Sequence, residues 1–298
     1  MTSGPRLAGQ LAALLLVAAG CAVVPGAAVR HHRPPPARPS IAAPGTTATP
    51  PRRAIVPRVR RVAVAVPVLM YHVIASAPPG APYPGLYVPA SEFAAQMHAL
   101  RRAGFHAVTL DQMRAFWLHG TPLPHGRPIV LTFDNGYRSQ YTEALPILRR
   151  MHWVGDLNLQ LAGLPPALGG LGRPLVRALV RAGWELDSQT YTHPDLVTLA
   201  GAALRHQVAG ARRELRRLYH VPALWFCYPS GDYSPAVIAA VRAAGFVGAT
   251  TTVPGWAHAG DDPFRTERLR VLAGTSGQAL LALLSANRHD PPPPAAAG

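Results

Sequence analysis

The sequence contains no lysine, so all 29 of its cationic side chains are arginines. Acidic residues number only 14, and none precedes Glu92. Residues 1–91 therefore carry nine arginines without an opposing carboxylate. A nucleic-acid-binding domain would gather its cations on a folded face with interleaved aromatic side chains. We interpret the arginine content as compositional bias and predict no nucleic-acid partner.

Cysteine is also scarce, with only Cys21 and Cys227 in the chain. If Cys21 is removed or modified, Cys227 has no partner within the chain, which excludes a disulfide framework. Cys227 lies in an apolar and aromatic run, so we expect a small core residue rather than a reactive thiol.

The apolar run from Leu7 to Ala19 is too short for a comfortable membrane span. Arg6 before it and small residues after it give the pattern of a secretory signal. The stretch Ala18-Ala19-Gly20-Cys21 also resembles a bacterial lipobox, which would place a lipid anchor on Cys21. Residues 1–21 are therefore predicted to be a signal peptide or a lipoprotein signal, and both alternatives stay open. Either one predicts an extracytoplasmic protein, secreted or anchored at the cell surface.

Residues 22–61 are rich in proline and contain eight of the arginines. Such a segment buries too little apolar surface to offset its ordering entropy, so we predict a linker. It is expected to be a solvated spacer, although its charge would also suit an anionic wall polymer. We predict one folded domain over residues 62–285 and a disordered tail over residues 286–298.

Short apolar runs alternate with amphipathic segments through the predicted domain. This alternation predicts an α/β fold with a parallel sheet. The number of units and the lack of a dinucleotide-binding glycine pattern favour a barrel over an open sheet. The expected strands are Val62–Met70, Ala107–Thr109, Ile129–Phe133, Asp156–Leu161, Glu185–Ser188, Leu224–Tyr228, Val247–Thr251 and Arg268–Leu272. The expected helices are Ser91–Ala103 with Ser91 as N-cap, Tyr141–Met151, Leu175–Ala182, Ala200–Tyr219 and Pro235–Ala244.

Two polar segments follow predicted strands. The first is Leu131-Thr132-Phe133-Asp134-Asn135-Gly136-Tyr137, and the second is Ser188-Gln189-Thr190-Tyr191-Thr192-His193. A carboxylate thus ends one strand, and an imidazole follows another. In a (β/α) barrel, groups at the C-terminal ends of strands face the active site.

These segments resemble the first two motifs of the polysaccharide deacetylase family, also called the NodB-homology or carbohydrate esterase 4 family. The family normally has Thr-Phe-Asp-Asp-Gly and His-Ser/Thr-x-x-His, whereas this chain has Asn135 and Gln189 at two of the positions. The resemblance implies a distorted, incomplete (β/α) barrel.

By the same resemblance, Asp134 corresponds to the catalytic base, and Asn135, Gln189 and His193 correspond to the metal ligands. Neutral amides are poor zinc ligands, so we expect a weakened site for zinc or a similar divalent metal. Asp187 should share a strand face with Gln189 and is a candidate for replacing the lost charge. Alternatively, its carboxylate bonds loop backbone or an arginine. Asp156, Asn158 and Gln160 should share one face inside the barrel, either to bind sugar or as core polar groups.

Further segments carry the resemblance. Val68-Leu69-Met70-Tyr71-His72 is similar to the first strand of the branch that acts on poly-N-acetylglucosamine, which implies that His72 is a general acid. Phe226 to Gly231 resembles a Tyr-Pro-x-Gly segment, so Tyr228, Pro229 and Gly231 are expected to bind substrate, together with Tyr137. Arg268-Leu269-Arg270-Val271 resembles the last strand of the same branch.

Three functions compete at this point. The first is a hydrolase that removes acetyl groups from an N-acetylated or O-acetylated cell-wall or surface polysaccharide through a metal-activated water, with Asp134 as base. The second is a non-catalytic glycan-binding protein, because Asn135 and Gln189 replace metal ligands. The third is a surface interaction protein that acts through its basic linker.

Overall fold

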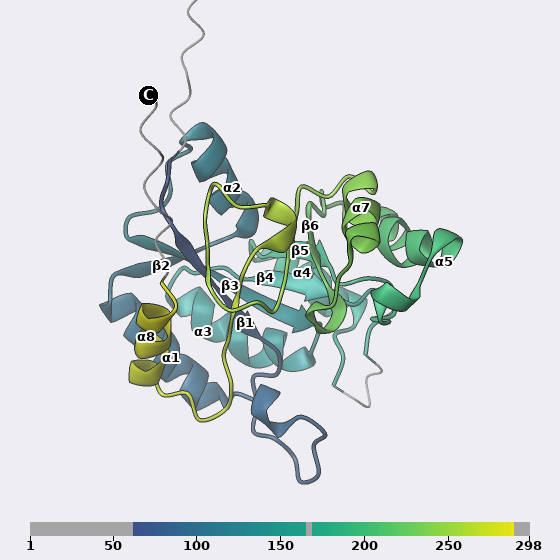
Figure 1. Ribbon diagram of the computed structural model, residues 1–298. Coiled ribbons are helices and arrows are strands. Elements are labelled where there is room, and N and C mark those ends of the chain that lie inside the picture. Colours follow the sequence, from purple (N-terminus) through teal and green to yellow (C-terminus); the bar gives the residue numbers. More distant parts are fainter. Residues whose placement is uncertain (1–61, 165–168, 289–298) are drawn as a thin grey trace, which may run out of the picture. The chain divides into compact units, whose positions relative to one another are not determined.

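The structure, a computed structural model, describes residues 62–164 and 169–288 (Figure 1). The predicted signal segment, the predicted linker and residues 289–298 of the predicted tail lie outside the described residues. No helix of the described part is both long and apolar enough to cross a membrane.

One mainly parallel sheet organises the described residues. Its strands follow the order β7-β6-β5-β4-β3-β1-β8, with β2 paired to β3 and β9 paired to β1. Only β8 runs antiparallel to its neighbour among these pairs. The curled sheet and its helices confirm the predicted α/β half-barrel. The strands are β1 Val66–Tyr71, β2 Phe105–Val108, β3 Arg127–Asn135, β4 Asp156–Leu159, β5 Glu185–Ser188, β6 Trp225–Cys227, β7 Gly248–Thr250, β8 Trp256–Ala257 and β9 Leu269–Arg270.

Residues 266–271 bridge the open side of the sheet between β7 and β1. Thr266 forms an isolated parallel bridge to Thr250 of β7. Three residues later, Leu269 of β9 pairs with Leu69 of β1. This crossing segment carries Arg268 into the barrel interior, where its side chain is 1% exposed.

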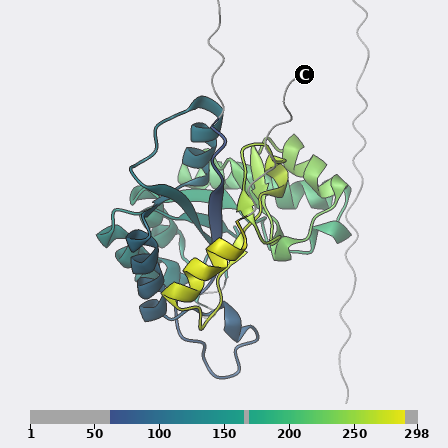
Figure 2. The same cartoon turned by 60° about the vertical axis from the view of Figure 1, so that its left-hand side comes forward.

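Helices cover the outside of the sheet, and α1 and α8 lie side by side in both ribbon views (Figures 1 and 2). The largest apolar cluster lies between these helices and β1–β5, around buried rings such as Phe93, Phe133 and Trp184. The helices are α1 Ala90–Arg102, α2 Leu110–His119, α3 Leu145–Arg150, α4 Arg173–Arg181, α5 Gly201–Arg205, α6 Ala211–Tyr219, α7 Pro235–Ala243 and α8 Gly277–Ala286. Two short π-helical turns, Gln140–Ala144 and His206–Gly210, precede α3 and α6.

The structure corrects some of the expected elements. Helix α1 begins after Pro89, and Ser91 lies in its first turn rather than at the N-cap. Helices α2 and α8 and strand β8 were not predicted from the sequence. Helix α2 is nonetheless well specified locally, because Thr109 and Gln112 form a reciprocal capping box.

Helix α8 packs against α1 and starts at Ser276, whose hydroxyl accepts a hydrogen bond from the Ala279 N–H at 3.1 Å. We expect Ser276→Ala to lower the free energy of unfolding by about 1 kcal/mol, because the Ala279 N–H in the first turn of the helix loses its hydrogen-bond acceptor. Urea unfolding of the full chain measures this. Ser276→Asp keeps an acceptor and should be nearly neutral, and equal losses in both variants would contradict the capping role.

Candidate functional site

A cavity of about 580 Å³ opens at the C-terminal ends of β1, β3, β5 and β6. It brings together residues that lie far apart in the sequence. Five of the residues expected from the sequence do not line it, namely Asp187, Pro229 and the three possible sugar-binding residues Asp156, Asn158 and Gln160. The expected residues that line it are His72, Asp134, Asn135, Tyr137, Gln189, His193, Tyr228 and Gly231.

Asp134 lies at the floor of the cavity and is 2% exposed. Its two carboxylate oxygens accept hydrogen bonds from the two terminal nitrogens of Arg268, at 2.8 and 3.0 Å. Asn158 Nδ2 donates a further bond to Asp134 Oδ1 at 2.8 Å. Burial alone would raise the pKa of Asp134, but the charge of Arg268 outweighs it and, together with His72 and these hydrogen bonds, lowers the pKa to about 2. Asp134 is therefore an ionised carboxylate held in one orientation.

Every N–H group of Arg268 has an acceptor. Besides Asp134, the guanidinium donates to the Thr251 carbonyl oxygen, Thr132 Oγ1 and Cys227 Sγ. A guanidinium can be buried without a large energetic cost only when its charge is paired and its N–H groups all have hydrogen-bond acceptors, as they do here. Burial and the neighbouring Asp134 charge raise the pKa of the Cys227 thiol to about 12, so it remains protonated beside the ion pair.

His72 stands next to Asp134, with its Nε2 3.9 Å from Asp134 Oδ2. Burial lowers the pKa of His72 to about 4, and this effect outweighs the opposing pull of Asp134. The imidazole is thus neutral near pH 7. Its Nδ1 is buried without a hydrogen-bond partner among the described residues.

Gln140 connects the two strands that carry these groups. Its Nε2 donates to the His72 carbonyl oxygen at 2.9 Å and to the Asp134 carbonyl oxygen at 2.8 Å. Gln140 is fully buried in the π-helical turn Gln140–Ala144. The turn therefore fixes the ends of β1 and β3 relative to each other.

Gln189 bonds both of the other positions that correspond to metal ligands, through the backbone of Asn135 and the imidazole of His193. Gln189 Oε1 accepts a hydrogen bond from the Asn135 backbone N–H at 2.7 Å. Gln189 Nε2 lies 3.3 Å from His193 Nε2, where the amide donates to the imidazole lone pair. A catalytic zinc needs three free donors, preferably imidazole or carboxylate. In this arrangement one imidazole lone pair and one amide oxygen are occupied, so the residues do not fit such a metal.

The rim of the cavity has unusual backbone geometry. Asn135, Thr190, His193 and Ser230 all have positive φ, between 56° and 71°. Non-glycine residues rarely adopt this conformation, and such strain gathers at functional sites. The Thr190 hydroxyl supports the turn by accepting a hydrogen bond from the His193 N–H at 2.9 Å.

The segment after β6 forms one side of the cavity. The Tyr228 hydroxyl donates a hydrogen bond to the Phe264 carbonyl oxygen at 3.0 Å. The ring of Tyr228, rather than its hydroxyl, therefore borders the cavity. Gly231 has φ of 85°, and a Cβ there would lie 2.1 Å from Thr252 Oγ1. Only glycine allows this approach. Pro229 is buried behind them.

Asp187 lies apart from Gln189 and His193. Its Oδ1 accepts a hydrogen bond from the Trp225 backbone N–H at 2.9 Å. It groups instead with Asp156 and Glu185, and within the described residues these three carboxyls are the ones placed closely enough to share a cation. All three pKa values are raised, chiefly by burial.

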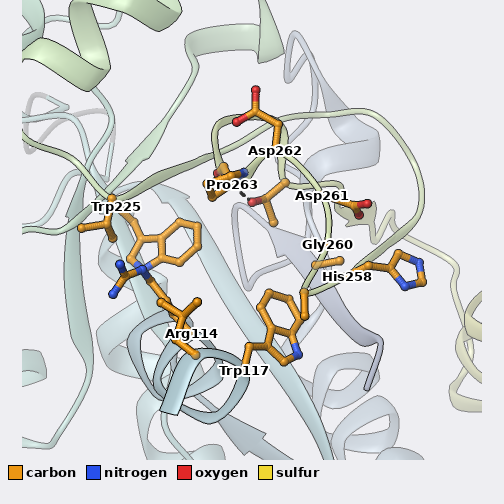
Figure 3. A pocket seen from close by; sticks show the side chains of 13 residues that line it. Arg114, Trp117, Trp225, His258, Gly260, Asp261, Asp262 and Pro263 are labelled. Carbon is orange, nitrogen blue, oxygen red and sulfur yellow. Dashed lines mark hydrogen bonds between the residues drawn. The ribbon is translucent and has the colours of Figure 1, made fainter. Parts of the chain in front are cut away.

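A second cavity, of about 280 Å³, lies between α2, Trp225 and the loop 257–263. Figure 3 shows the indoles of Trp117 and Trp225 in its wall, with Arg114 beside them. Both indole N–H groups are engaged, with Val64 and Asp111. None of the expected site residues lines this cavity. The candidate functional site is therefore the cavity around Asp134.

The sequence motifs did not assign roles to Arg268, Asn158 or Gln140. Arg268 begins the segment Arg268-Leu269-Arg270-Val271, which resembles the last strand of the poly-N-acetylglucosamine branch. That resemblance placed Arg268 near the barrel but did not indicate that it pairs with Asp134. Gln140 had no such signal, because its contacts depend on the π-helical turn. Asn158 was placed inside the barrel by strand periodicity, but its bond to Asp134 could not be derived from that.

We expect Arg268→Met to lower the free energy of unfolding by about 3–5 kcal/mol at pH 7, because it leaves a buried carboxylate unpaired. The native pKa of Asp134 lies below its ordinary value, so the wild type loses this stabilisation only as the pH falls from about 4 towards 2. The deficit of the variant should therefore shrink in acid. Arg217→Met, which breaks an exposed pair with Glu214, is the control and should leave the urea midpoint unchanged. Equal stability of Arg268→Met and wild type would disprove the role of the pair.

Comparisons with known proteins agree with this geometry. Residues 123–249 match the family model described as polysaccharide deacetylase. YxkH of Bacillus subtilis, classed as a polysaccharide deacetylase, is 26% identical over 222 residues, which cover 74% of this chain and 76% of that protein. A 54-residue stretch is 44% identical to the poly-β-1,6-N-acetyl-D-glucosamine N-deacetylase of Escherichia coli, covering 18% of this chain and 8% of that enzyme.

The fold is shared with solved deacetylase structures. The deacetylase PplD of Streptococcus pyogenes superposes with a TM-score of 0.68 at 23% identity, covering 75% of this chain and 99% of that one. The matched motifs, the relative in Bacillus and the common half-barrel lead to one assignment. Over residues 123–249 the chain is similar to the polysaccharide deacetylases, and it shares the half-barrel fold of solved deacetylase structures.

Proposed function

We propose that the protein removes acetyl groups from an N-acetylated polysaccharide, or from an O-acetylated one, with Asp134 as general base and His72 as proton carrier. The observation that supports this most is the ionised Asp134 carboxylate, oriented by Arg268 and Asn158 beside His72 in an open cavity. Near pH 7 both groups are in their proton-accepting forms, so Asp134 can take a proton from water and His72 can receive it and pass it on.

Amide hydrolysis requires a water positioned for attack and a proton for the leaving amine. Asp134 Oδ2 accepts hydrogen bonds from Arg268 Nη2 at 3.0 Å and Cys227 Sγ at 3.6 Å. It also lies 3.9 Å from His72 Nε2, so it is the oxygen placed to accept a further bond from a water between the two side chains. A carboxylate with so low a pKa orients water well but holds a proton poorly. Asp134 accepts the proton as the O–H bond of the attacking water breaks, and the neutral imidazole of His72 relays that proton to the leaving amine as the C–N bond breaks.

Metal chemistry is typical of the family, but the residues at the metal positions do not fit a catalytic zinc as they are placed. We therefore derive no step through a metal. The amides of Asn135 and Gln189 are the groups left to polarise the acyl oxygen. Neutral donors stabilise an oxyanion less than a cation does, so we expect a slow hydrolase.

A second candidate function is glycan binding without hydrolysis. The contact between Gln189 Nε2 and His193 Nε2 favours it, because it closes the ligand positions into a hydrogen-bonded network. Amide side chains in such a network suit the hydroxyl and acetamido groups of sugars. Tyr137 and Tyr228 would then contribute apolar surface for a sugar ring.

The expected partner is a polysaccharide outside the cytoplasm. The relative in Escherichia coli is named for its action on poly-β-1,6-N-acetyl-D-glucosamine. We propose a cell-wall or surface polysaccharide as substrate here, with the protein secreted or held at the surface through a lipid on Cys21. Globomycin sensitivity of processing would distinguish a lipid anchor from simple cleavage.

The hydrolase proposal predicts acetate release from acetylated amino-sugar oligomers by the full chain, and its loss in Asp134→Asn. Removing the charge that orients water should lower kcat by about 100-fold or more. Release is measured with metal-stripped protein and again with added zinc or cobalt. No release under any condition, together with saturable oligomer binding, would favour the glycan-binding function.

In the glycan-binding function, Asn135 and Gln189 turn a former metal site into a polar network, which predicts that Asn135→Asp with Gln189→His restores metal binding. The double variant regains a carboxylate and an imidazole beside His193, which together form a suitable zinc ligand set. Calorimetry should show one zinc ion bound per chain, against none for wild type. Asp134→Asn in the same background is the control and should still bind zinc. A double variant that binds no zinc would contradict the interpretation.

A further inference from the structure

The segment that crosses the open side of the sheet carries a second arginine, two residues after the buried one. Side chains two residues apart in an extended segment share a face, and both Arg268 and Arg270 line the candidate-site cavity. The strand register agrees, because Arg270 pairs with Met70 on β1, and Met70 lines the same cavity. The adjacent pair, Leu69 and Leu269, belongs instead to the largest apolar cluster. Arg270 therefore stands above Arg268, at the exposed edge of the cavity.

The two guanidiniums differ in their partners. The cavity lining contains one carboxylate, Asp134, and Arg268 already neutralises it. Arg270 takes part in none of the ion pairs among residues 62–164 and 169–288, and its side chain has no hydrogen-bond partner among them. Apart from its two imidazoles, the lining of the cavity thus has one positive charge without a counterion.

An exposed aromatic ring lies on the same edge of the cavity. Tyr83 lines the cavity and is 69% exposed, whereas most large apolar side chains of the described residues are buried. The Ala273 N–H donates a hydrogen bond to the Gly85 carbonyl oxygen at 2.9 Å, which joins the segment after β9 to the loop that carries Tyr83. Arg270 and Tyr83 therefore come from adjacent segments. One edge of the cavity presents an unpaired cation and an aromatic ring that no other side chain covers.

The unpaired charge of Arg270 discriminates between possible ligands. A neutral glycan that fills the cavity displaces water from the guanidinium and offers no charge in return, which is unfavourable. A glycan that carries a carboxylate or a phosphate compensates this loss, because guanidinium binds both groups through two parallel hydrogen bonds. The exposed ring of Tyr83 supplies an apolar face for the sugar that carries the anionic group.

We propose that Arg270 and Tyr83 form a subsite for an anionic sugar unit, in which the Tyr83 ring packs against the sugar and the Arg270 guanidinium pairs with its carboxylate or phosphate. The substrate class is then an acidic polysaccharide. This inference rests on the proposed function, because the subsite belongs to the same cavity. Both side chains act on affinity. The competing role for Arg270 is to stabilise charge on the reacting acyl group, and it predicts an effect on kcat instead.

Three tetramers of N-acetylglucosamine test the subsite because they differ only at the sixth carbon, which carries a hydroxyl, a carboxylate or a phosphate. Calorimetry with the full chain measures their affinities. We expect at least one charged tetramer to bind about 10-fold or more tightly than the neutral one. This preference should fall as the salt concentration rises. The carboxylate and phosphate tetramers show which anion is preferred. Equal affinities for all three, or no binding of either charged tetramer, would overturn the proposal.

Variants assign the preference to the two side chains, and both positions are exposed, so the variants should fold. Arg270→Gln should lose the preference for charged tetramers and change the affinity for the neutral one by less than about 2-fold. Arg102→Gln removes an exposed charge from α1 and is the matched control. A preference that survives in Arg270→Gln would refute the pairing. Tyr83→Ala should weaken binding of all three tetramers by about 5-fold, whereas Tyr83→Phe should not. Unchanged affinities in Tyr83→Ala would refute the stacking.

Acetate release separates a binding role from a role in the reaction. Arg270→Gln should raise KM for the preferred charged tetramer by about 10-fold and leave kcat within about 2-fold. An equal loss of kcat on neutral and charged tetramers would overturn the proposal, because it would assign the cation to the reacting acyl group. If no tetramer gives acetate but the charge preference is measured and is lost in Arg270→Gln, the hydrolase function fails and the subsite stands.

Discussion

The ion pair between Arg268 and Asp134 is the interaction on which the site depends. Each partner is nearly inaccessible to solvent, so neither could be charged there without the other. The pair explains why the segment 266–271 crosses the open side of the sheet, since that path delivers a guanidinium to the barrel interior. It also explains why Thr132, Cys227 and the Thr251 carbonyl oxygen surround it, because each accepts an N–H that would otherwise be buried without a partner.

The carboxyl groups in the barrel interior differ in their pKa: that of Asp134 is lowered, and those of Asp156, Glu185 and Asp187 are raised. Asp134 is ionised because a cation compensates its desolvation, whereas no ion pair is formed by Asp156, Glu185 or Asp187 with any cation of the described residues; they accept the N–H groups of Leu110, Asp111 and Trp225. Their raised pKa values follow from the same burial that Arg268 overcomes at Asp134. Asn158 lies between the charged and neutral groups and donates to the former. Among the described residues Arg268 is the arginine that is buried, and its position decides which of the interior carboxyls is ionised.

Much of the site could be predicted from the sequence, because its residues follow apolar strands directly. Asp134, Asn135, Gln189 and His193 were placed by the strand ends, and β5 was predicted with its correct bounds. Arg268 and Gln140 could not be assigned, since their contacts join segments whose pairing depends on the whole barrel. Helices α2 and α8 were missed because neither is separated from its neighbours by a clear change of periodicity. Asp187 was expected to point the same way as Gln189, but its carboxyl accepts the Trp225 N–H and groups with Asp156 and Glu185 instead.

The separation of 134 residues between Asp134 and Arg268 has a consequence for the order of assembly. During synthesis, the strand that carries the carboxylate emerges long before its counterion exists. Until residue 268 is available, an ionised Asp134 must remain hydrated, because closing the sheet over the unpaired charge would carry a large electrostatic penalty. The interior of this protein is thus completed last, from its C-terminal side, and contacts that span so much of the chain form slowly.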